Sequence, residues 1–151
     1  MKKLLAVLMM FVFSTSVVAG TNTKINLTDE MACLVEAIYF EARNQPTIGQ
    51  IAVAQVILNR VESVRFPDTI CRVVNQPRQF SYRYDVPVLR YTDQIAYRKA
   101  MQIAETAYFD MIFDITDGAT MYHATRIRPS WDWTKLSETV TINDHVFYIH
   151  H

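Results

Sequence analysis

The sequence lacks the features of a nucleic-acid-binding protein and of an integral membrane protein. Its 15 Lys and Arg residues are balanced by 15 Asp and Glu residues. This balance gives no electrostatic basis for binding a phosphate backbone or an anionic lipid surface. No apolar run approaches the roughly 20 residues that a membrane-spanning helix needs. Internal repeats, low-complexity tracts and linkers are also absent, so a single domain is expected.

The histidines lack the spacing of a metal site. His123, His145, His150 and His151 show no His-Glu-x-x-His or comparable pattern of ligands. We therefore expect no metal ion and no other cofactor.

The first 19 residues have the pattern of a secretory signal peptide. Lys2 and Lys3 precede an apolar run from Leu4 to Phe13, and small residues lead to Ala19. Ten apolar residues are too few to span a bilayer, so a cleaved signal is favoured over a membrane anchor. Residues 20–151 would then form one domain with a net charge of −2. The expected product is an exported monomer, periplasmic or extracellular, without stable membrane insertion.

Only two cysteines are present, Cys33 and Cys71, and both lie in the part that would be exported. An oxidising compartment permits a disulfide between them, whereas two buried thiols are the alternative. The export signal favours the disulfide.

The first half of the chain has the apolar periodicity of α-helices. A helix is expected from Thr28, as its N-cap, to Ala42, and a second from residue 48 to 64. The second helix is apolar nearly all round, so it should lie at the centre of the core. Arg60 falls within its most apolar stripe, where a buried arginine needs an acidic partner or several carbonyl groups.

The second half combines helix, loop and strand patterns. A short helical element is expected over residues 70–75, an irregular loop over 76–91, and a helix from Thr92, as its N-cap, to Phe109. Strands are expected over residues 119–124, 139–142 and 145–149, with Asn143-Asp144 as a two-residue hairpin loop. The predicted fold class is therefore α+β, with N-terminal helices packed on a small antiparallel sheet.

Two glutamates of the first predicted helix differ in their expected surroundings. On a helical wheel that starts at Met31, Glu36 falls at about 140°, away from the apolar stripe, and Glu41 at about −80°, at its edge. Glu36 is interpreted as a solvated surface acid. Partial burial and the helix C-terminus should raise the pKa of Glu41, as a general acid requires. A salt bridge between Glu41 and Arg60 is the structural alternative.

Six ordered blocks of sequence resemble the SleB-type cell-wall hydrolases, the family of the spore cortex-lytic enzymes. They are residues 33–60, Arg65-Phe66-Pro67-Asp68-Thr69-Ile70, Gln79-Phe80-Ser81, residues 117–125, Arg128-Pro129-Ser130-Trp131 and Asp144-His145-Val146-Phe147-Tyr148. The resemblance implies a lytic transglycosylase that acts on peptidoglycan glycan strands. It also implies a lysozyme-like fold related to the resuscitation-promoting factors.

The resemblance assigns the catalytic role to Glu41, in the motif Glu41-Ala42-Arg43. Asn44 and Gln45 stand where family members often have Gly and Glu, and Met121 stands where many have His. One carboxyl group can serve such a reaction, because the muramic acid's own 6-hydroxyl attacks C1 and closes a 1,6-anhydro ring.

Further residues are predicted to bind the glycan, and other functions stay open. The predicted binding residues are Gln79, Phe80, Ser81, Tyr122, His123 and Trp131, with core packing as the alternative for each aromatic residue. A hydrolytic muramidase would need a second carboxyl group, for which Asp117, Asp132 and Glu138 are the candidates. A zinc-dependent amidase or peptidase and a non-catalytic peptidoglycan-binding module are the rival classes. The sequence does not separate a host remodelling enzyme from a phage lysis enzyme.

Overall fold

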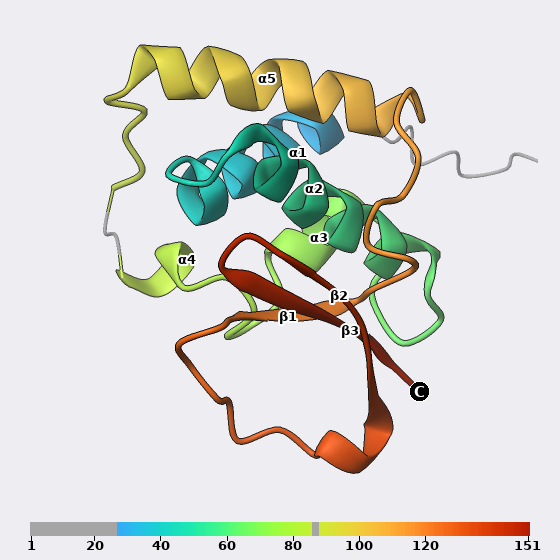
Figure 1. Ribbon diagram of the computed structural model, residues 1–151. Coiled ribbons are helices and arrows are strands. Elements are labelled where there is room, and N and C mark those ends of the chain that lie inside the picture. Colours follow the sequence, from blue (N-terminus) through green and yellow to red (C-terminus); the bar gives the residue numbers. More distant parts are fainter. Residues whose placement is uncertain (1–26, 86–87) are drawn as a thin grey trace, which may run out of the picture.

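The computed structural model describes residues 27–85 and 88–151, which form a helical layer above a small antiparallel sheet (Figure 1). The elements are α1 (Leu27–Ala42), α2 (Thr47–Glu62), α3 (Ile70–Val74), α4 (Tyr82–Asp85), α5 (Gln94–Tyr108), β1 (Met121–Ala124), a 3-10 helix η1 (Trp133–Lys135), β2 (Leu136–Ile142) and β3 (His145–His150). This arrangement confirms the predicted α+β class. The predicted signal peptide, residues 1–19, lies outside the described residues.

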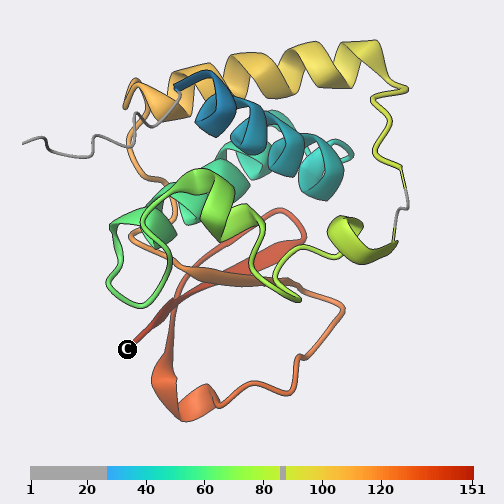
Figure 2. The same cartoon turned by 180° about the vertical axis from the view of Figure 1, so that it is seen from behind.

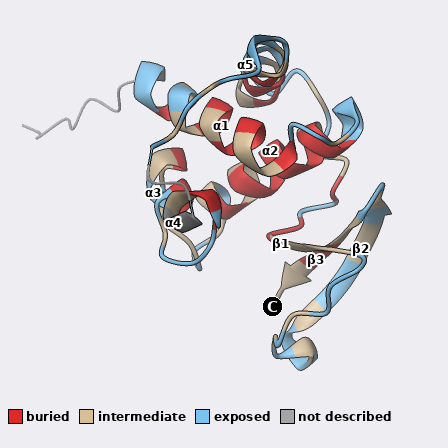
Figure 3. Ribbon diagram, turned by 90° about the vertical axis from the view of Figure 1, so that its left-hand side faces the viewer, coloured by how far each residue is buried: buried red, intermediate tan, exposed pale blue. Residues whose placement is uncertain are grey.

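Helix α2 is the centre of the helical layer. Helices α1 and α5 both contact it, and α1 also packs against α3 and α5 (Figure 2). The buried residues concentrate where these helices meet (Figure 3). Leu34 and Ile38 of α1 and Val53 and Ile57 of α2 are completely buried. The predicted central position of the second helix is therefore confirmed. None of the helices in the described ranges is long and apolar enough to cross a membrane.

The sheet has the strand order β1-β3-β2, and both pairs are antiparallel. Phe147 of β3 packs with Val56 of α2 in a second, smaller core cluster, which fixes the sheet to the central helix. The hairpin loop between β2 and β3 approaches the start of α2 at Gly49. A Cβ added there would lie 3.0 Å from the side-chain nitrogen of Asn143, so glycine permits the approach. Asn143 has a φ of 51°, as the predicted hairpin loop requires.

Several predicted element boundaries are wrong. Helix α1 begins at Leu27, so Thr28 lies inside its first turn instead of capping it. The N-cap of α5 is Asp93 and not Thr92, because the Asp93 carboxylate accepts the N–H groups of Ile95 and Ala96. The predicted loop over residues 76–91 contains the short helix α4, and β2 begins three residues earlier than predicted.

A disulfide joins α1 to α3. Cys33 and Cys71 are bonded, with their Cα atoms 5.2 Å apart, as predicted. The bond closes a chain separation of 38 residues. It fixes α3, and with it the start of the following irregular segment, against the helix that carries Glu41.

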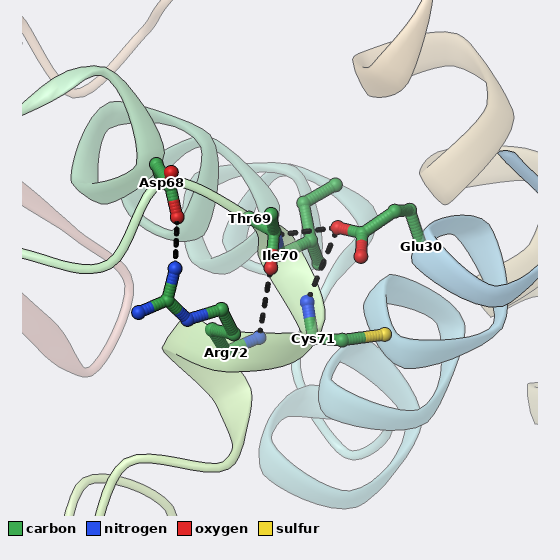
Figure 4. Close-up of polar contacts among 6 residues, drawn as sticks. All are labelled: Glu30, Asp68, Thr69, Ile70, Cys71 and Arg72. Carbon is green, nitrogen blue, oxygen red and sulfur yellow. Dashed lines mark hydrogen bonds and ion pairs between the residues drawn. The ribbon is translucent and has the colours of Figure 1, made fainter. Parts of the chain in front are cut away.

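Glu30, in the first turn of α1, stabilises the same junction between α1 and α3 (Figure 4). Glu30 is 9% exposed. Its carboxylate accepts the N–H of Ile70 at 2.6 Å and that of Cys71 at 3.2 Å. These N–H groups belong to the first two residues of α3 and therefore have no partner within that helix. The Thr69 hydroxyl accepts a third, from Arg72, at 3.2 Å.

Candidate active site

Glu41 lies in a cavity of about 710 Å³ between the helical layer and the sheet. The cavity is lined by Glu41, Arg60, Pro77, Arg78, Gln79, Ser81, Met121, Tyr122 and Trp131. These residues come from α1, α2, the segment before α4, β1 and the loop before η1. The predicted position of Glu41, at the boundary between the core and a cleft, is therefore confirmed in geometry.

Burial raises the pKa of Glu41 to about 6. A hydrogen bond from the backbone N–H of Ser81 and the positive charge of Arg60 act in the opposite direction and limit the rise. One carboxyl oxygen, Oε1, is buried without a hydrogen-bond partner among the described residues. The carboxyl group thus holds a proton at mildly acidic pH, and its Oε1 has no hydrogen bond to the described residues that a substrate would have to displace.

Arg60 is buried beside Glu41 without forming an ion pair with it. Within the described residues, no nitrogen of Arg60 lies within 4.0 Å of a Glu41 oxygen. The Nε–H of Arg60 instead donates to the carbonyl oxygen of Thr120 at 2.7 Å. Its guanidinium carbon lies 5.1 Å from the ring centroid of Phe66 and 5.7 Å from that of Phe80. The salt-bridge alternative for Glu41 is therefore wrong.

The segment from Pro77 to Ser81 forms the wall of the cavity that contacts Glu41. Phe80 is 1% exposed and packs in the core, which anchors the segment. Gln79 and Ser81, on either side of Phe80, are exposed and line the cavity. Phe80 was expected to bind the glycan, but its ring is buried and serves this anchoring role instead.

Of the predicted binding residues in the second half of the chain, two line the cavity and one does not. Tyr122 and Trp131 line the cavity with Glu41. The pKa of the Tyr122 hydroxyl is raised by burial and by the charge of Glu41, so the hydroxyl stays neutral. His123 is not part of the lining: its ring stacks on Tyr148, and Nε2 lies 3.1 Å from the Tyr148 hydroxyl. Its ring lies 5.5 Å, between centroids, from that of Trp131, which does line the cavity.

Three lining residues, Pro77, Arg78 and Met121, were not expected at the site. Arg78 has a φ of 63°, a backbone conformation that no periodic pattern in its loop indicates. The place of Arg60 in an apolar stripe of the sequence predicts a partner for its buried charge, but not that it lines a cavity.

Glu41 is the only carboxyl group in the lining of this cavity, as far as the structure describes the chain. Asp117 is an exposed turn residue with a φ of 55°. Asp132 is exposed, caps η1 and pairs with Lys135 at 3.1 Å. Glu138 is exposed on β2. None of the three candidates for a second catalytic acid lies with Glu41.

Glu36 is not the solvated acid that the helical wheel predicts. Its carboxylate accepts a hydrogen bond from the Tyr82 hydroxyl at 3.1 Å and pairs with Arg83 at 2.5 Å. Tyr82 and Arg83 belong to α4, so their side chains join α4 to this part of α1. The prediction is wrong because it treated the face of α1 opposite the apolar stripe as open to solvent.

No group of three or more His, Cys, Asp or Glu residues is placed to hold a metal ion within residues 27–85 and 88–151.

Comparisons with known sequences identify related proteins. The model of a family described as Cell Wall Hydrolase matches residues 44–148, a range that begins three residues after Glu41. The spore cortex-lytic enzyme of Bacillus cereus is 33% identical over 132 residues, which cover 85% of this chain and 48% of that protein. The spore cortex-lytic enzyme of Bacillus subtilis is 30% identical over 122 residues, covering 79% and 37%. The chain thus spans about half the length, or less, of these curated relatives.

Two solved structures share the fold. The catalytic domain of the Bacillus cereus SleB protein superposes with a TM-score of 0.64 at 28% identity, over 80% of this chain and 90% of that one. The catalytic domain of the germination-specific lytic transglycosylase SleB from Bacillus anthracis gives a TM-score of 0.62 at 28% identity, over 80% and 93%. The resemblance drawn from the six sequence blocks is confirmed.

Proposed function

The chain belongs to the cell wall hydrolase family, and we propose that it is an exported enzyme that cleaves the glycan strands of peptidoglycan. The proposed reaction is lytic transglycosylation, with Glu41 as the only catalytic carboxyl group. The observation that carries the proposal is the cavity of about 710 Å³, in which Glu41 is the sole acid among the described lining residues.

In the first proposed step, Glu41 acts as a general acid. Its carboxyl proton passes to the glycosidic oxygen as the bond between that oxygen and C1 of muramic acid breaks. The leaving sugar thus departs as a neutral alcohol, and Glu41 becomes a carboxylate. The burial that raises the pKa of Glu41 to about 6 keeps this proton available at mildly acidic pH.

In the second proposed step, the same carboxylate acts as a base. It removes the proton from the 6-hydroxyl of the muramic acid while that oxygen forms a bond to C1. The product ends in 1,6-anhydromuramic acid, Glu41 is protonated again, and no water is consumed. Because the nucleophile belongs to the substrate, no second carboxylate is needed to activate water.

Four other lining residues are proposed to hold the glycan. The side chains of Gln79 and Ser81 offer hydrogen bonds to sugar hydroxyls from one wall of the cavity. Tyr122 of β1 and Trp131 of the loop before η1 offer aromatic surface and polar groups. The names of the relatives support the substrate class: they are called spore cortex-lytic enzymes, and one solved neighbour is titled a lytic transglycosylase. Such a substrate places the proposed action outside the cytoplasm.

Digestion of purified sacculi tests the glycan specificity. We expect the protein to release soluble disaccharide-peptides, identified by mass spectrometry, at the same rate with and without a metal chelator. Free stem peptides, or activity lost in chelator, would instead indicate an amidase or peptidase. Binding to sacculi without release of any product would indicate a binding module and would refute the proposed enzyme.

A further inference from the structure

Two buried polar atoms without hydrogen-bond partners belong to residues in the wall of the same cavity. They are Oε1 of Glu41 and Nη1 of Arg60, and neither has a partner among the described residues. Arg60 is 4% exposed, so its guanidinium is almost completely removed from solvent. Native proteins rarely leave buried charged groups unpaired, because desolvation is costly, and such groups concentrate at functional sites.

We propose that Arg60 is a positioning residue for Glu41: its fixed positive charge stabilises the carboxylate form of Glu41 between the two proton transfers. This inference rests on the proposed function, since only that reaction requires Glu41 to change charge in each cycle. Once Glu41 has given its proton to the leaving oxygen, a partly buried carboxylate is left in the cavity. Without a nearby cation, the reverse step would be favoured, in which the departing hydroxyl re-forms its bond to C1 as Glu41 takes the proton back.

The contacts of Arg60 hold its guanidinium in place without neutralising it. One N–H is used by the Thr120 carbonyl, a second nitrogen lies 3.8 Å from the Met121 sulfur, and the ring of Phe66 packs against the guanidinium. None of these partners carries a negative charge. Burial lowers the pKa of Arg60, yet a guanidinium titrates so far above neutrality that it remains protonated.

The separation between the two side chains is part of the proposal. A direct ion pair would hold Glu41 as a carboxylate and deprive it of the proton that the first step needs. A cation beyond 4 Å only moderates the effect of burial, which remains the larger influence on Glu41. The other titratable groups of the lining are Arg78, which is exposed, and Tyr122, which is neutral.

The pKa of Glu41 in an Arg60→Gln variant tests the proposal directly. Glutamine removes the charge and can still donate a hydrogen bond toward the Thr120 carbonyl. Carbon-13 NMR of the glutamate carboxyl groups, assigned with Glu41→Gln, should show the pKa of Glu41 about one or more higher than in the wild type. The alkaline limb of the pH profile of kcat/KM should move by the same amount. Arg60→Lys should restore both values, and Arg72→Gln, on the exposed face of α3, should change neither.

An unchanged Glu41 pKa in a folded Arg60→Gln variant would overturn the proposal, even if activity fell. If Arg60→Gln does not fold, the double variant with Glu41→Gln decides. It should fold, because the carboxylate that lost its cation is gone, and failure to fold would overturn the proposal. The NMR titration needs no activity: a wild-type protein inactive on sacculi, together with the expected pKa change, would refute the proposed function alone.

Discussion

Helix α1 carries a buried or half-buried glutamate near each end, and the two carboxyl groups differ in their hydrogen bonding. Glu30 is satisfied by two backbone N–H groups at the start of α3. Glu41 keeps one buried oxygen without a partner among the described residues and has a raised pKa. The comparison teaches that burial alone does not mark a catalytic acid. A carboxylate whose hydrogen bonds are complete stabilises the fold, whereas one left incomplete in a cavity remains available for chemistry.

Glu41→Gln should have the largest effect of any single substitution. The amide keeps the size of the side chain but cannot donate and then retrieve a proton, so we expect release of muropeptides from sacculi to fall by about 10³-fold or more. A thermal melt should show an intact fold. Glu105→Gln, on the exposed face of α5, is the matched control and should keep full activity. A folded Glu41→Gln variant with near wild-type activity would exclude Glu41 as the acid.

Loss of the disulfide should have the next largest effect, at the Glu30 end of α1. Replacing Cys33 and Cys71 by alanine frees a loop of 38 residues. In the chain-entropy description this lowers the free energy of unfolding by about 3–4 kcal/mol, less any strain released. Urea denaturation of the double variant measures the loss. A change below about 1 kcal/mol would show that Glu30 and the core hold α3 in place without the bond.

Glu30→Ala should destabilise the protein by about 2–3 kcal/mol, because two N–H groups at the start of α3 lose a charged acceptor. Urea denaturation should show this loss, whereas kcat should change less than about threefold because Glu30 lies outside the cavity that holds Glu41. A Glu30→Ala variant that kept its stability but lost activity would contradict the structural role assigned to Glu30.

Glu41→Gln should also change stability, in a direction that depends on pH. The pKa of Glu41 is raised from 4.5 to about 6 in the folded protein, so protonation favours folding. The wild type therefore loses stability as the pH rises from about 4.5 to 6, by about 1–2 kcal/mol after allowance for partial exposure. The glutamine variant has no such titration. Its stability relative to the wild type should rise by this amount between pH 4 and pH 8, measured by urea denaturation, and a constant difference would contradict the raised pKa.

The sequence predicts the surroundings of Glu41 better than those of Glu36. Apolar periodicity indicates which face of α1 is buried, and that is enough to place Glu41 at the edge of the core. The surroundings of Glu36 depend on Tyr82 and Arg83, which lie in a segment without periodicity, so their contacts with α1 cannot be predicted from local pattern. Phe80 and Arg78 lie in the same segment, so the burial of Phe80 and the backbone conformation of Arg78 could not be predicted either. The long-range contacts of that segment complete the site, and helical periodicity does not predict them.

The mass and isotope content of the products test the central claim most directly. Sacculi digested in oxygen-18 water should yield fragments that end in 1,6-anhydromuramic acid, one water lighter than hydrolytic products, with no heavy oxygen at the new muramic end. This is the result expected if Glu41 acts alone and the 6-hydroxyl is the nucleophile. Reducing muramic ends that carry oxygen-18 would contradict the account, because water would then be the nucleophile and a second group would have to activate it.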